Sequence, residues 1–149
     1  MSHSQPNGEP SMSVAVRASL LGIAMFLCGG FLLALSVSPD PRGYGTHHQF
    51  GLPPCTFRTL SGYPCPGCGM TTSFSHFVRG DFAASARANL AGLVLASVCA
   101  LLIPWCLWSA YCGQLWMVAD PITVGGTLAV CLSGLAVLFW GARVLSAMT

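Results

Sequence analysis

The chain has 149 residues, of which 54% are hydrophobic and 7% are charged, and its formal net charge is +2. Soluble globular proteins carry about 25% charged residues, so this composition excludes an ordinary soluble domain. The six basic residues are all arginines scattered along the chain, which excludes the clustered basic surface that nucleic-acid binding requires. The composition is that of an integral membrane protein, and the lipid bilayer is therefore an expected partner.

Residues 1–13 are polar and rich in Pro and Ser, which predicts a disordered tail before a single membrane domain over residues 14–149. That domain contains apolar runs long enough to cross a hydrocarbon core of about 30 Å, which takes about 20 helical residues. The sequence therefore predicts an all-α membrane protein with three transmembrane helices, and Pro104 is expected to kink the second of them. The predicted spans cover about residues 18–37, 90–111 and 122–142.

A Cys/Pro/Gly-rich loop is predicted over residues 38–69, between the first two spans. After it, apolar residues recur at three- and four-residue spacing from Met70 to Val78, which is typical of an amphipathic helix. Gly80 is the residue type that ends a helix, and Asp81 is the type that caps the start of the next one. Short amphipathic helices at the membrane interface are therefore expected within residues 70–89.

The distribution of arginines predicts the orientation. With the N-terminus outside, one arginine (Arg17) lies outside and five lie inside: Arg42, Arg58, Arg79, Arg87 and Arg143. The positive-inside rule therefore predicts a multi-pass protein whose N-terminus is outside and whose cysteine loop is cytoplasmic. In an alternative interpretation residues 1–36 are a secretory signal with a cleavage site at residues 34–36, although the apolar run exceeds the usual length of about 7–15 residues. Export of the loop would place its thiols in an oxidising compartment.

The chain from Cys55 to Gly69 reads CTFRTLSGYPCPGCG, and its three thiols are the main candidates for chemistry. Cys65 and Cys68 form a C-x-x-C unit that enters a predicted helix, where amides and the helix dipole stabilise a thiolate. A thiolate is the form that binds a metal or attacks a disulfide. The remaining cysteines lie in or at the ends of the spans and are interpreted as small hydrophobes: Cys28, Cys99, Cys106, Cys112 and Cys131.

One interpretation is a site for zinc or another thiophilic metal, with Cys55, Cys65 and Cys68 as ligands. His47 or His48, in the loop upstream, can supply a fourth ligand. His76 is excluded, because eight helical residues beyond Cys68 correspond to about 12 Å of rise.

Two other interpretations stay open. Cys65 and Cys68 can cycle as a dithiol redox centre with Cys55 as resolving thiol, although no βαβ pattern of a thioredoxin-like domain is present. Alternatively, the prolines and glycines fix a structural turn, and the protein is a structural or assembly subunit that binds a membrane partner or a second copy of itself. No nucleophile–base pair or phosphate-binding loop is visible, so the sequence does not support an enzyme.

A set of positions has the spacing of a known family: Cys55, Gly62, the CPGCGMT run at residues 65–71, Gly80-Asp81 and Asn89. Over about residues 50–112 the chain resembles the small bacterial membrane proteins catalogued as domain of unknown function 2752. The resemblance implies a bacterial inner-membrane protein and no activity. Two positions depart from the family's pattern, because Thr72 stands where the family usually has an arginine and Leu90 where it commonly has a proline. If the family's arginine binds an anionic partner, Thr72 does not provide that interaction in this chain.

Overall fold

The computed structural model describes residues 12–118 and 120–148, and within these the chain forms helices and turns without a strand. In this part of the chain three helices are long and apolar enough to cross a membrane: α1 (Val14–Ser36), α5 (Leu90–Cys112) and α6 (Pro121–Met148). The predicted all-α fold with three membrane spans is therefore confirmed. The disordered tail predicted for residues 1–13 falls, apart from Met12 and Ser13, outside the described residues.

Side-chain caps start two of the long helices where the apolar runs begin. The Ser13 hydroxyl accepts a hydrogen bond from the Val16 amide (3.3 Å), and the Asn89 side chain accepts one from the Gly92 amide (3.0 Å). These acceptors satisfy backbone donors that have no partner within the helix. α5 continues through Pro104, the position at which a kink was expected.

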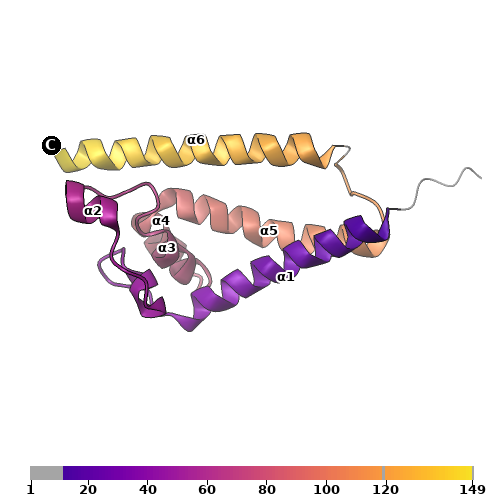
Figure 1. The fold of residues 1–149 in the computed structure, drawn as a ribbon, viewed down its shortest axis with the longest axis horizontal. Coiled ribbons are helices and arrows are strands. Elements are labelled where there is room, and N and C mark those ends of the chain that lie inside the picture. Colours follow the sequence, from indigo (N-terminus) through magenta and orange to yellow (C-terminus); the bar gives the residue numbers. More distant parts are fainter. Residues whose placement is uncertain (1–11, 119, 149) are drawn as a thin grey trace, which may run out of the picture.

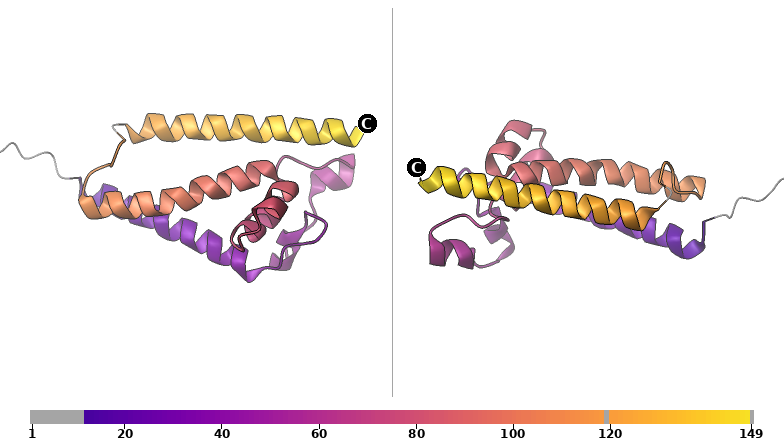
Figure 2. Two further views of the ribbon diagram at one scale, coloured as in Figure 1. Left: turned by 180° about the vertical axis from the view of Figure 1, so that it is seen from behind. Right: turned by 90° about the horizontal axis from the view of Figure 1, so that it is seen from above.

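α1 and α5 pack closely, whereas α6 lies alongside α5 with little burial. Two residues of α1, Leu20 and Ala24, form a buried cluster with Cys106 and Ala110 of α5. Small side chains let membrane helices approach closely, which suits this contact. The described residues of α6 include none that is buried, and the helix runs beside α5 in all views (Figures 1 and 2). Most of the α6 surface is therefore available to lipid.

Residues 37–89 form a helical cap at one end of the spans, where α1 ends and α5 begins (Figure 1). α3 and α4 confirm the short helices predicted within residues 70–89. The Asp81 side chain accepts a hydrogen bond from the Ala84 amide (2.9 Å), which makes Asp81 the N-cap that the sequence predicted. The loop predicted over residues 38–69 contains two helical turns that the sequence analysis missed. The cap comprises η1 (Thr46–Phe50), α2 (Thr56–Ser61), α3 (Met70–Phe77) and α4 (Phe82–Ala88).

Polar contacts fasten the cap to the spans. The Arg79 guanidinium donates to the carbonyls of Ala34 (3.2 Å), Leu35 (2.8 Å) and Val37 (2.8 Å) at the C-terminal end of α1. The carbonyl oxygens at the end of a helix have no N–H donor within the helix, so the Arg79 guanidinium supplies the missing hydrogen bonds. Inside the cap, the fully buried hydroxyls of Thr46 and Thr72 share a hydrogen bond of 2.8 Å. The cap is thus a fixed platform on which the cysteines are placed.

Candidate metal centre

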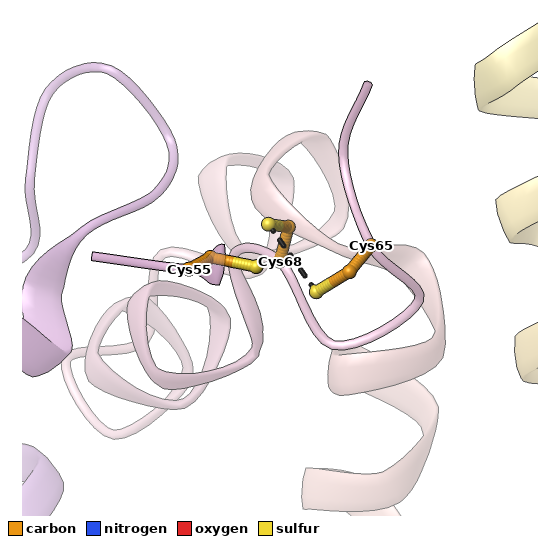
Figure 3. Close-up of side chains that lie close together, drawn as sticks. All are labelled: Cys55, Cys65 and Cys68. Atoms are coloured by element: carbon orange, nitrogen blue, oxygen red, sulfur yellow. Dashed lines mark hydrogen bonds between the residues drawn. The ribbon is translucent and has the colours of Figure 1, made fainter. Parts of the chain in front are cut away.

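The three predicted thiols converge within the cap. Cys55 is the N-cap residue of α2, and Cys65 and Cys68 lie on the turn that precedes α3. Within that turn, the Cys68 amide donates to the Cys65 carbonyl (3.0 Å) and the Cys65 thiol donates to the Cys68 sulfur (3.4 Å). All three Sγ atoms lie within 4.8 Å of one another (Figure 3).

This sulfur triangle (Cys55, Cys65 and Cys68) has the size of a metal site. An ion bound tetrahedrally with metal–sulfur distances of about 2.3 Å holds its sulfur ligands about 3.8 Å apart. The observed separations include one of 3.4 Å and none above 4.8 Å, so small movements of the side chains would bring all three to one ion. Cys68 is buried and the other two are half-buried, and all three are free thiols. Three sulfurs leave one position of a tetrahedron open.

Gly69 allows the C-x-x-C turn to sit against the rest of the cap. It has a φ of +84°, and a Cβ atom there would lie 2.5 Å from the Ala88 carbonyl oxygen and 2.6 Å from that of Gly43. Only glycine tolerates both the left-handed backbone and this close approach. The position of Cys68 therefore depends on the residue that follows it.

Side chains from both neighbouring spans hold the carbonyls of this turn. The Asn89 amide nitrogen donates to the carbonyls of Pro66 (3.2 Å) and Cys68 (3.0 Å). From α6, Arg143 donates to the Cys68 carbonyl (3.1 Å) and the Trp140 indole donates to Pro64 (2.7 Å). The sequence analysis named Asn89 as a family position but predicted no supporting role for Asn89, Trp140 or Arg143, because their partners lie 21–76 positions away and no local pattern connects them.

The two candidate histidines lie near the thiols, but the cluster of closely spaced ligand atoms contains no histidine among the described residues. His47 and His48 stack with ring centroids 4.4 Å apart in η1. They line a cavity of about 220 Å³ that Cys55 and Cys68 also line. His76 lies beside Asp81 (Nδ1–Oδ2 3.6 Å), apart from the sulfur triangle, in agreement with the helical-rise argument.

The thiols differ in acidity. Burial, followed by hydrogen bonds with the Cys68 and Cys55 sulfurs, raises the pKa of Cys65 to about 11. A hydrogen bond from the Arg58 amide, and then one from the Cys65 thiol, lower the pKa of Cys55. The expectation that the helix after the C-x-x-C unit favours a thiolate is therefore wrong for Cys65. Cys55 is the thiol whose pKa is lowered, and it lies at the N-terminal end of α2.

Comparisons with known proteins agree with the predicted resemblance. The chain matches no curated protein and no solved structure. The matched family region includes the sulfur triangle, Gly69 and Asn89 but ends before α6 and begins after the two histidines. Residues 55–103, about a third of the chain, match the family model described as "Protein of unknown function (DUF2752)", so over this region the predicted resemblance is confirmed.

Proposed function

We propose that this multi-pass membrane protein binds one thiophilic metal ion, Zn²⁺ or another soft cation, through Cys55, Cys65 and Cys68. The observation that carries the proposal is the convergence of the three sulfurs within 4.8 Å, two of them on a turn held by side chains from two spans. Thiolates select soft cations such as Zn²⁺ and Cu⁺ over hard ones. Water, His47 or His48 supplies the fourth ligand, since both histidines line the adjoining cavity.

Elemental analysis of the purified protein in detergent tests this proposal. About one equivalent of zinc or copper per chain is expected in the wild type, and Cys65→Ser should remove it. Cys131→Ser is the matched control, because Cys131 is an exposed thiol on α6 outside the sulfur triangle. Wild-type protein without metal above background, also after incubation with Zn²⁺ or Cu⁺, would end the proposal. Loss of metal on His47→Ala or His48→Ala would identify the fourth ligand.

A second candidate function, thiol–disulfide exchange, rests on the 3.4 Å between the Cys65 and Cys68 sulfurs. An external disulfide would accept the two electrons: one thiolate attacks it and releases the first thiol. The neighbouring cysteine then closes the Cys65–Cys68 disulfide and releases the second. The raised pKa of Cys65 disfavours attack by this thiol at neutral pH. Metal binding ranks first because it accounts for the convergence of all three sulfurs, whereas the Cys65–Cys68 disulfide uses two of them. Thiol trapping in intact cells should show both cysteines interconverting if the exchange occurs, and permanently reduced cysteines count against it.

The orientation in a bacterial inner membrane is also part of the proposal. Arg143 contacts the cap, so five arginines lie at the cap end, whereas Arg17 lies at the other end beside Gly113. The positive-inside rule then supports a cytoplasmic cap. Because α1 packs against α5, we infer that the first span is retained in the protein and is not removed as a signal peptide. A membrane-impermeant maleimide should label Cys55 only after the membrane is opened, and labelling in intact cells would reverse the orientation.

A protein partner, or a second copy of the chain, remains the alternative role for the exposed α6 surface. A structural subunit would insert and bind its partner after all three cysteines of the sulfur triangle are changed to serine. Loss of partner binding in that variant would favour the chemical roles of the thiols instead.

A further inference from the structure

The cavity beside the sulfur triangle has a cationic lining. Its walls include Arg58, His47 and His48 as well as Cys55 and Cys68, and no carboxylate lines it. The nearby acid, Asp40, is bound to Arg42 through two side-chain hydrogen bonds of 3.0 and 2.7 Å. One fixed positive charge, two imidazoles and no acid favour an anionic occupant.

The Arg58 guanidinium is held in place by Tyr44, and its N–H groups are available to bind an anion. Its guanidinium carbon lies 3.6 Å from the centroid of the Tyr44 ring, a cation–π contact that fixes the plane of the group. Within the described residues the guanidinium donates no hydrogen bond to a protein acceptor, although Arg58 is only partly exposed. The planar N–H fork of arginine matches two oxygens of a phosphate or carboxylate. An arginine stacked on one face therefore keeps its edge for a ligand.

We propose that this cavity binds a phosphate-type oxyanion, carried by a lipid headgroup or by a soluble molecule, through Arg58 with His47 and His48. A volume of about 220 Å³ accommodates such a group. Because Cys55 and Cys68 share the cavity wall, the bound oxyanion lies next to two of the proposed metal ligands. The inference does not require the metal, and it is tested in metal-free protein.

Alkylation of Cys55, followed by site-resolved mass spectrometry, measures the charge preference of the cavity. Iodoacetate is anionic and iodoacetamide is neutral, so the ratio of their rates at Cys55 cancels changes in accessibility and thiol acidity. Arg58→Gln should lower this ratio about 5- to 10-fold, since it removes the adjacent positive charge. Arg58→Lys should leave the ratio close to its wild-type value, because lysine keeps the positive charge. Arg42→Gln is the matched control, because Arg42 approaches Tyr44 at 5.3 Å without lining the cavity.

Competition identifies the source of the anion. Protection of Cys55 from iodoacetate by millimolar inorganic phosphate in a neutral detergent indicates a soluble ligand. Protection by phosphatidylglycerol in mixed micelles, with none by a neutral glycolipid, indicates a headgroup. A ratio unchanged by Arg58→Gln overturns the inference, and so does the absence of protection by both phosphate and phosphatidylglycerol. Metal analysis of the same preparations shows separately whether the proposed function holds.

Discussion

Three glycines around the cysteines differ in what a methyl group would meet, and this difference predicts a graded series of stabilities. Gly67 has an ordinary backbone and open space around it. Gly62 has a φ of +76° but also faces open space. Gly69 combines a φ of +84° with two carbonyl oxygens within 2.6 Å of the added Cβ. Alanine substitution at these positions therefore separates backbone strain from steric overlap.

The expected magnitudes follow from these two effects. Gly67→Ala should change the free energy of unfolding by less than about 1 kcal/mol, in the stabilising direction, because alanine restricts the unfolded chain. Gly62→Ala should cost about 1 kcal/mol, the left-handed penalty of about 1–2 kcal/mol less that gain. Gly69→Ala adds about 1–3 kcal/mol for displaced neighbours and should cost about 3 kcal/mol.

Thermal unfolding in detergent, followed by tryptophan fluorescence, measures the series. At about 2–4 °C per kcal/mol, Gly69→Ala should lower the Tm by roughly 6–12 °C, and Gly62→Ala by a few degrees. Gly69→Ala should also weaken metal binding, because Cys68 precedes the displaced residue. If Gly62→Ala and Gly69→Ala destabilise the protein equally, the contacts of Gly69 with the cap carry no energy and the reasoning is refuted.

Three further predictions concern side chains around the cap. Because the pKa of Cys65 is about 11, metal binding must displace its proton. Log affinity should therefore rise by at least about one per pH unit between pH 6 and 9, because Cys65 alone releases a proton over this whole range, and a flat profile in chelator competition contradicts this. Arg79→Ala should cost about 2–3 kcal/mol in thermal unfolding because the α1 carbonyls lose their donor, whereas Arg87→Ala should cost less than about 0.5 kcal/mol. Asn89→Asp keeps the α5 cap but removes the donor to the Cys68 carbonyl, so chelator competition should show metal affinity lowered about 10-fold or more; unchanged affinity contradicts a supporting role.

Hydrophobicity and helix-end chemistry made the spans and α4 predictable, since the Asp81 cap and the apolar runs are local in sequence. The triad of cysteines was also predictable as a group, because three thiols stood in one Pro/Gly-rich stretch. Distinguishing the thiols was not possible. The acidity of Cys55 depends on α2, a helix of six residues that has no apolar period to reveal it. The acidity of Cys65 depends on burial, which only the assembled cap determines.

The two departures from the family's pattern have simple physical consequences here. Leu90 occupies the first turn of α5, where proline is favoured because that amide needs no partner inside the helix. Leucine is compatible with that position, and the Asn89 cap is retained. Thr72 is fully buried, and its hydroxyl bonds to Thr46, so in this chain it joins η1 to α3 and does not face a ligand. The arginine that lines the cavity together with Cys55 and Cys68 is Arg58, which the family pattern did not indicate.

The C-x-x-C turn is also where α6 is attached to the rest of the molecule. Lipid is as apolar as the surface of a membrane helix, so apolar area does not decide where such a helix docks, whereas polar contacts and close packing do. α6 has no buried residue among those described, yet Trp140 and Arg143 donate to the carbonyls of Pro64 and Cys68. The position of α6 and the geometry of the thiols therefore depend on the same few carbonyls. An ion drawn into the sulfur triangle would tighten the turn and, through these hydrogen bonds, fix the C-terminal end of α6 against the cap.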